Sequence, residues 1–313
     1  MSGWPERLVA GFDDWPEGLS RFVGWQAARW PRLQAALDGL STVRSRQVPC
    51  GEGAVEVQWN PGRTVNTTAA VDAASIAARR CFLCPGHLPH EEHGIAFSDL
   101  VVLCNPAPIL PGHLVLAHRE HRPQEVRPAV GPLVAFAAAQ DRFTAVYNGP
   151  RSGASAPDHL HLQAVGAGLL PEERRARSGR WVDDSSGRLV VGFTGAPADV
   201  EADLRAAIEL LAEAQGTAEP DLNLLATAHS EGLQALLFPR GAHRPACFFA
   251  QEPTRCVVSP GAIDMAGVLV TVRERDYHVL DRLAIERIYS ETSLAPATAA
   301  AYRAVLERSW NHE

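Results

Sequence analysis

Residues 147–163 have the sequence YNGPRSGASAPDHLHLQ, in which a glycine- and serine-rich loop runs directly into an alternating strand. Successive side chains of a strand point to opposite faces, so His159, His161 and Gln163 are expected to line one surface. The two leucines between them then enter the core. Imidazole and amide groups in a row are costly to bury without partners, which indicates a functional site. The alternative is a solvent-facing strand edge with incidental histidines.

The loop before this strand, residues 148–155, has the composition of an anion-binding loop. Small residues such as Gly153 let backbone N–H groups approach an anion closely. The Arg151 guanidinium and the hydroxyls of Ser152 and Ser155 add further donors. Because a glycine/serine loop alone is usually only a turn, the prediction of a site depends on the strand that follows it.

The same run resembles the active-site segment of one branch of the histidine-triad superfamily. That branch contains galactose-1-phosphate uridylyltransferase, diadenosine tetraphosphate phosphorylase and the GDP-hexose phosphorylases, and it replaces the third histidine by glutamine, as at Gln163. Further resemblances to this branch lie in CNPAPILPGHLVLAHREH (104–121), VSPGAIDMAGVLVTVRERDY (258–277), QWNPGR (58–63) and RRCFLCPGHLP (79–89). The first is similar to the strand–loop–strand that carries the nucleoside, and the second to a C-terminal segment of the GDP-hexose phosphorylases. The last two resemble a bacterial family related to these phosphorylases, and together the resemblances cover most of residues 55–280.

The resemblance implies a role for each matching residue. His161 matches the nucleophile that forms a nucleotidyl-histidine, and neutral imidazole is competent for this near pH 7. Gln163 would hold a non-bridging phosphate oxygen. The catalytic set that the resemblance implies is His161, Gln163, Asn148 and Ser155. The substrate-binding set is Asn105 for a ribose hydroxyl, with Arg63, Arg151, Ser152, Gly153 and Arg240. Arg63 and Arg240 are weaker candidates, since each could be a surface arginine.

Gln163 also narrows the expected reaction, because an amide cannot protonate a basic leaving group. A sugar phosphate or nucleotide leaves without that proton. This favours transfer to phosphate or a sugar phosphate, and the resemblance of residues 258–277 to the GDP-hexose phosphorylases implies a phosphorylase that acts on an NDP-hexose, with inorganic phosphate as acceptor. The alternatives are a dinucleoside polyphosphate (Ap4A-type) phosphorylase, a nucleotidyltransferase with another acceptor, and a non-catalytic nucleotide sensor.

Cys81 and Cys84 have the C-x-x-C spacing of zinc ligands. The resemblance to the uridylyltransferase adds His121 and His159, which would complete a structural zinc site with four protein ligands. A rival set joins the cysteines to two of the nearby histidines His87, His90 and His93. A third possibility is that the two thiols are buried and bind no metal.

Charge and composition restrict the partners. The 313 residues carry a formal net charge of −7, which argues against binding a nucleic-acid backbone. The sequence contains no lysine, so phosphate must be held by arginine, histidine, backbone N–H groups or a metal. Neither a membrane-spanning run nor a secretion signal is recognisable, and a cytoplasmic monomer or homodimer is expected.

The pattern of expected elements predicts an α+β fold. A histidine-triad-like fold would have a mainly antiparallel sheet, flanking helices and two related halves. The expected domains are an N-terminal helical segment (1–50), a catalytic half with the zinc site (51–195) and a second half (196–313).

Overall fold

A large antiparallel sheet organises the computed structural model, which describes residues 3–12, 14–15, 17–175 and 177–311. Within these residues the sheet has nine strands in the order β3-β4-β5-β7-β6-β10-β11-β9-β8, and every neighbouring pair is antiparallel. The strands are β3 (Ile95–Phe97), β4 (Leu100–Cys104), β5 (Leu114–His118), β6 (Phe143–Asn148), β7 (His161–Gly166), β8 (Gly179–Asp183), β9 (Val190–Gly195), β10 (Leu222–His229) and β11 (Gly232–Pro239). The expected α+β class and mainly antiparallel sheet are confirmed.

The sheet contains the same connectivity twice. Two strands, a helix and two further strands follow one another as β4-β5-α5-β6-β7, and again as β8-β9-α6-β10-β11. The spatial orders are β4-β5-β7-β6 and, read from the opposite edge, β8-β9-β11-β10. The two units therefore meet where β6 pairs with β10. This repeat relates the two halves of the sheet, while the domain boundaries given above stay a prediction.

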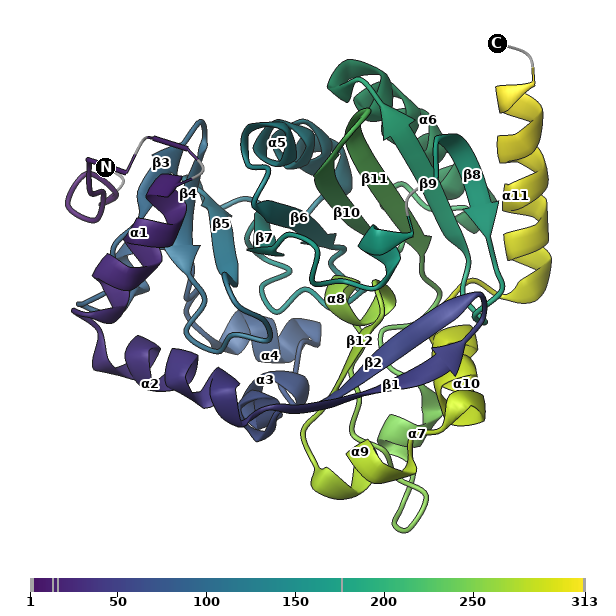
Figure 1. The fold of residues 1–313 in the computed structure, drawn as a ribbon, viewed down its shortest axis with the longest axis horizontal. Helices are drawn as coiled ribbons and strands as arrows, with labels where there is room; N and C mark the ends of the chain where they lie inside the picture. Colours follow the sequence, from purple (N-terminus) through teal and green to yellow (C-terminus); the bar gives the residue numbers. More distant parts are fainter. Residues whose placement is uncertain (1–2, 13, 16, 176, 312–313) are drawn as a thin grey trace.

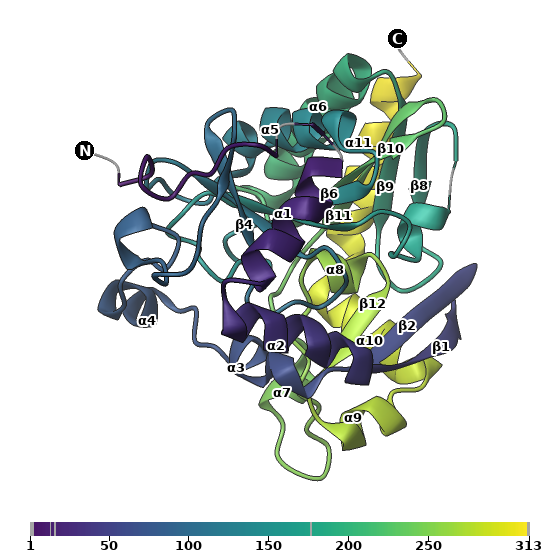
Figure 2. The same cartoon turned by 60° about the vertical axis from the view of Figure 1, so that its left-hand side comes forward.

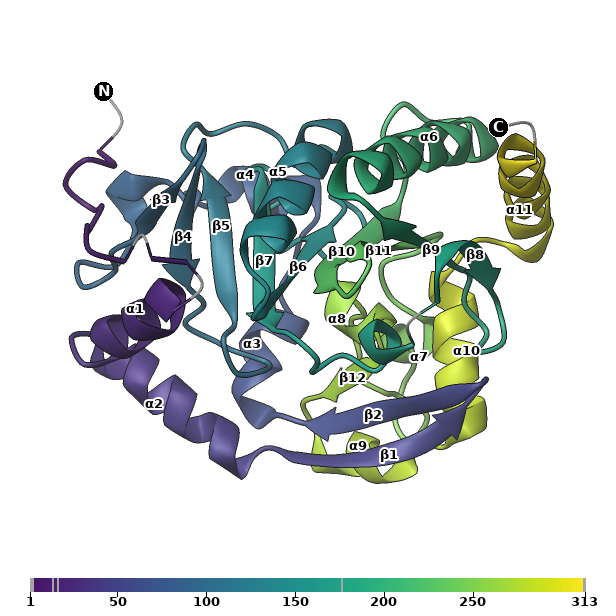
Figure 3. The same cartoon turned by 45° about the horizontal axis from the view of Figure 1, so that its top comes forward.

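Helices cover one face of the sheet. α5 (Val126–Ala139) and α6 (Pro197–Gln215) lie across it, with α1 (Glu17–Ala27) and α11 (Pro296–Trp310) at opposite ends (Figure 3). The largest apolar core lies between these helices and the sheet, and it includes Leu160 and Leu162 as expected. α6 begins with a proline and is followed by Gly216, whose φ of 64° is the left-handed conformation that glycine adopts at little cost.

The other face carries a smaller sheet, visible at the lower right of Figure 2. β1 (Arg44–Cys50) and β2 (Gly53–Trp59) form an antiparallel hairpin, and β12 (Val268–Thr271) pairs with β2 in parallel. A second apolar core joins this sheet, α8 (Ala262–Met265) and α10 (Arg282–Thr292) to the large sheet. Segments from both ends of the chain thus close over the middle of the large sheet.

Short helices complete the described structure. They are α2 (Pro31–Gly39), α3 (Thr64–Thr67), α4 (Ala73–Ala78), α7 (Ala246–Phe249) and α9 (Glu274–Val279), with 3-10 turns at Leu40–Thr42, Pro61–Arg63, Pro85–His87 and Glu172–Arg174. None of the helices in the described ranges is long and apolar enough to cross a bilayer.

Candidate functional site

His161 is the first residue of β7 and is almost completely buried, at 2% exposure. Its Nδ1–H donates to the carbonyl of His159 at 2.8 Å. This contact fixes the tautomer, because one ring nitrogen of a neutral imidazole carries the proton and the other keeps its lone pair. Burial lowers the pKa of His161 to about 4, so the ring is neutral at physiological pH. Nε2 is therefore the nitrogen with a free lone pair.

A buried glutamine clamps the backbone on which this ring is mounted. Gln124, 1% exposed, accepts from the His161 N–H at 2.8 Å and donates back to the His161 carbonyl at 3.0 Å. The same amide nitrogen also donates to the carbonyl of Asn148 at 2.8 Å. One side chain thus joins the start of β7 to the end of β6.

Gln163 follows on the same face of β7 and is oriented by His113. The buried ring of His113 accepts from the Ile109 N–H at Nδ1 (3.0 Å), which places its proton on Nε2. Nε2–H donates to Oε1 of Gln163 at 2.8 Å. Burial, with the Arg63 cation nearby, lowers the pKa of His113 to about 3, so this ring is neutral. With its oxygen held, Gln163 has an amide nitrogen that meets no acceptor among the described residues.

Asn148, at the end of β6, is fixed in a similar way. Its Oδ1 accepts from Nδ2 of Asn223 at 2.9 Å and from the backbone N–H of Ala262 at 2.7 Å. Asn223 lies opposite Asn148 on β10 and is in turn held by Arg240, whose Nη1 donates to its Oδ1 at 2.5 Å. The oxygen of Asn148 is therefore occupied, and its amide N–H groups remain for a ligand.

Arg240 is not placed as a ligand-binding residue. Its side chain is fully buried, and its remaining donors go to the carbonyls of Thr292, Pro260, Ala242 and His243. The expectation that it contacts phosphate or a second substrate is corrected accordingly: Arg240 positions Asn223 from behind.

The glycine/serine loop divides into residues that face the site and residues that do not. Gly153, with φ of 103°, and Ser155 line cavities beside His161. An added Cβ at Gly153 would lie 2.9 Å from the Cα of Gly261, so the loop can pack there only with glycine. Arg151 instead turns outward to an ion pair with Asp221 at 2.9 Å, and Ser152 is fully buried and lines neither cavity. The geometry therefore does not place the side chains of Arg151 and Ser152 in contact with a substrate.

Two cavities meet at the site. The larger, about 350 Å³, contains His161, and its lining combines apolar side chains of β4, β5 and residues 82–89 with a similar number of polar and charged ones. The smaller, about 80 Å³, lies between the loop and residues 259–264. Gln163, Ser155, Arg63 and Asn66 line both cavities. A group bridging the two cavities would thus pass Gln163 and Ser155.

Arg63 and Asn105 lie at this junction and in the larger cavity, respectively. Arg63 also donates to the carbonyl of Ala107, and burial lowers its pKa only to about 10, so it stays cationic at neutral pH. Asn105 packs its amide nitrogen 3.1 Å from Nε2 of His113, while its Oδ1 accepts from the Ala107 N–H. Both residues are placed where contact with a nucleotide is possible.

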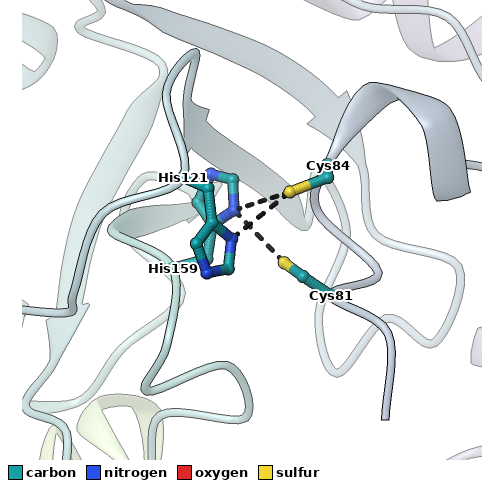
Figure 4. A group of neighbouring side chains, drawn as sticks. All are labelled: Cys81, Cys84, His121 and His159. Carbon is teal, nitrogen blue, oxygen red and sulfur yellow. Dashed lines mark hydrogen bonds between the residues drawn. The ribbon is translucent and has the colours of Figure 1, made fainter.

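The structure brings together Cys81, Cys84, His121 and His159 (Figure 4). One donor atom from each of these residues lies within 4.8 Å of the others. The Nδ1 atom of His159 is 3.2 Å from Sγ of Cys81 and 3.6 Å from Sγ of Cys84, and the His121 Nδ1 is 3.3 Å from the latter. Tetrahedral zinc with its usual bond lengths would separate sulfur and nitrogen ligands by about 3.6 Å.

The orientation of His159 also suits a metal ligand. Its Nε2–H donates to the carbonyl of His118 at 2.7 Å, which leaves the Nδ1 lone pair towards the sulfurs. Two of the three rival histidines use Nδ1 for backbone contacts. His87 donates to the Cys81 carbonyl at 2.9 Å, and His93 donates to that of Glu91 at 2.9 Å. The donor set fits a closed structural zinc site behind the strand that carries His161.

Three residues of the site lie outside the predicted sets: Gln124, His113 and Asn223. His113 is within the PGH segment that resembled the nucleoside-carrying strands, so its position was a usable signal. Gln124 lies in a polar connector and Asn223 at the start of a strand of the second unit. Only the folded chain brings these two beside Asn148.

Comparisons with known proteins agree with this architecture. A family model described as "Domain of unknown function (DUF4922)" matches residues 22–166. No curated protein matches the sequence. A crystal structure of yeast Ap4A phosphorylase Apa2 is similar to the chain at 14% identity and a TM-score of 0.53, covering 84% of this chain and 97% of that one.

The same yeast enzyme in complex with AMP is similar at 15% identity and a TM-score of 0.50, covering 87% of this chain and 96% of that one. Its complex with Ap4A gives 16% identity and a TM-score of 0.53, covering 87% of this chain and 97% of that one. At such identities the likeness concerns the fold, and the chain therefore shares the fold of yeast Ap4A phosphorylase Apa2 over most of its length.

Proposed function

We propose that this protein is a nucleotidyl-transferring phosphorylase that works through a covalent nucleotidyl-histidine at His161. The observation that carries the proposal is the arrangement of His161. Its Nδ1 proton is held by the His159 carbonyl, and it lies in a cavity that meets a second one at Gln163 and Ser155. A nucleophile at such a junction suits a substrate with a nucleoside on one side of the reacting phosphorus and a leaving group on the other.

In the first step the Nε2 lone pair of His161 attacks the α-phosphorus, and the bond to the bridging oxygen of the leaving phosphate breaks. The leaving group takes that electron pair, and the ring keeps its Nδ1 proton on the His159 carbonyl. In the second step an oxygen of inorganic phosphate attacks the same phosphorus. The P–N bond then breaks, its electron pair returns to Nε2, and a nucleoside diphosphate is released.

The other residues supply charge and orientation for these steps. The free amide nitrogen of Gln163 would donate to a non-bridging oxygen, and Arg63 would neutralise charge where the cavities meet. His113 fixes the orientation of the Gln163 amide, and Gln124 fixes the backbone of His161. Asn148 and Ser155 would orient the phosphate from the loop side.

A dinucleoside polyphosphate is the better-supported donor, because the solved structures of this fold include an Ap4A phosphorylase with AMP and with Ap4A. An NDP-hexose remains a second candidate. The segment 258–277, which resembles the GDP-hexose phosphorylases, contributes Ser259 and residues 261–264 to the smaller cavity, where the leaving group would lie.

Zinc is proposed at Cys81, Cys84, His121 and His159 as a structural ion. With four protein ligands it would have no open position, so it would brace the strand that carries His161 and take no part in the reaction.

Intact-protein mass spectrometry tests the proposal directly. Wild type, His161→Ala and a matched control, His229→Ala, are mixed with Ap4A, Gp4G and a panel of NDP-hexoses. We expect a mass gain of one nucleoside monophosphate in wild type and control, none in His161→Ala, and loss of the adduct when phosphate is added. The donor that labels fastest identifies the leaving group. An adduct that persists in His161→Ala, or turnover without any adduct, would overturn the mechanism.

A further inference from the structure

The larger cavity contains a buried carboxyl group that no contact inside the protein explains. Glu92 is 5% exposed and lines this cavity. Its backbone is hydrogen-bonded, but its side chain makes no hydrogen bond or ion pair with any residue that the structure describes. A buried carboxyl without partners is unfavourable, so a ligand that supplies the missing donors is the natural complement.

A cationic side chain faces the same cavity. Arg32, on α2, lines it and is close enough to act on the charge of Glu92. Within the described part of the chain, Arg32 also has no hydrogen-bond or ion-pair partner. The cavity therefore offers a pair of acceptor oxygens and a fork of donors, framed by apolar side chains such as Leu83, Leu103 and Val115.

Guanine is the base whose edges match this pair of groups. Its N1–H and N2–H₂ groups are adjacent donors for a carboxylate, while O6 and N7 are adjacent acceptors for an arginine fork. Adenine has only its N6 amino group to donate to an ionised carboxylate. That amino group lies beside N7, so on this edge a donor would face the donors of the arginine. Pyrimidines lack the second edge altogether.

We propose that Glu92 and Arg32 select a guanine nucleotide, with Glu92 accepting from N1–H and N2–H₂ and Arg32 donating to O6 and N7. The inference rests on the proposed function only in placing the nucleoside in this cavity. In the free protein, burial raises the pKa of Glu92 to about 8, against the opposing charges of Arg7 and Arg32. The two guanine donors favour the ionised form and so offset the cost of deprotonation near neutral pH.

Binding of GMP, IMP and AMP by isothermal titration calorimetry tests the inference without any turnover. IMP lacks the N2 amino group, and a hydrogen bond to a charged group contributes enough that its loss weakens binding roughly tenfold or more. We expect GMP to bind best, IMP roughly tenfold more weakly and AMP more weakly still. In Glu92→Gln the amide presents one donor and one acceptor, so the preference for GMP over AMP should collapse or invert.

The matched control is Glu91→Gln, which changes an adjacent but exposed carboxylate and should leave the three affinities unchanged. A wild-type preference for AMP, no mononucleotide binding, or a GMP preference that survives in Glu92→Gln would overturn the inference. Repeating the titrations with His161→Ala separates the two proposals. Selective GMP binding without labelling of His161 would refute only the proposed function. Equal labelling by guanine and adenine donors would refute only the base assignment.

Discussion

Replacing Gln124 by methionine should weaken both the fold and the nucleophile. The substitution keeps a side chain of similar length in a position that is 1% exposed, and it removes the amide that makes three hydrogen bonds. Those bonds run to the N–H and carbonyl of His161 and to the carbonyl of Asn148, at 2.8, 3.0 and 2.8 Å. Methionine cannot replace any of them, so three backbone groups lose their partner at once.

The magnitude follows from those three contacts. A neutral hydrogen bond contributes about 1 kcal/mol net, so the loss is about 3 kcal/mol, and more if the backbone groups stay dry. For a chain of this length that corresponds to a fall in Tm of roughly 6 °C. The backbone under His161 would also become less well fixed, so the rate of nucleotidyl transfer should fall further than the affinity for GMP.

Gln140 provides the matched control. It is 0% exposed, and neither atom of its amide has a hydrogen-bond partner in the described structure. Gln140→Met therefore deletes no bond and should leave the free energy of unfolding within about 1 kcal/mol of wild type, or raise it. Chemical denaturation of both variants, with the rate of His161 labelling, measures the difference. If Gln124→Met is no more destabilised than Gln140→Met and labels at the wild-type rate, the hydrogen bonds of Gln124 contribute neither to stability nor to the reactivity of His161.

Three further outcomes are expected. In the ligand-free protein, the stability advantage of Glu92→Gln over wild type should grow as pH rises from 4.5 to about 8. Burial raises the pKa of Glu92 to about 8, so over this range the carboxyl ionises in the unfolded chain but stays protonated in the folded protein, which destabilises wild type. The difference in unfolding free energy between the two proteins should reach roughly 3–5 kcal/mol above that window. A difference that does not change with pH would contradict this prediction. Cys81→Ser should lower bound zinc well below one ion per chain by elemental analysis, whereas Cys50→Ser, at a thiol outside the cluster, should not; zinc retained in Cys81→Ser would exclude the site. His113→Ala should slow adduct formation roughly ten- to hundredfold while leaving GMP affinity unchanged, because the Gln163 amide loses its orientation; an equal loss of affinity would indicate a merely structural role.

The sequence pattern was sufficient to predict the site where neighbouring residues of one segment form it. The alternation after residue 159 placed His161 and Gln163 on one face, and the intervening leucines entered the core as expected. The strand itself begins only at His161, because His159 is held in the preceding loop by its contact with the His118 carbonyl. That displacement is what lets His159 face the cysteines while His161 faces the cavity.

Partners from distant segments could not be found in this way. Arg240 has the charge of a phosphate ligand, and only its complete burial shows that its donors are used by nearby carbonyls and by Asn223. Arg151 lies in the right loop, yet Asp221 across the surface draws it outward. Periodicity and motif spacing contain no information on which side of a loop a long side chain turns, since the competing partner is set by the tertiary fold.

The second unit contributes to the candidate site although its own strands do not repeat the pair His161 and Gln163. β11, which occupies the place of β7, has the sequence GLQALLFP and lacks the histidine that begins β7. Its neighbour β10 instead supplies Asn223, which donates to Oδ1 of Asn148 and to the carbonyl of Ser152, 2.9 and 2.7 Å away. Arg240 secures Asn223 from the end of the same hairpin. Because the seam between the units runs through Asn148, we expect a fragment ending before β10 to lose the geometry of the glycine/serine loop (148–155) even if its own strands folded.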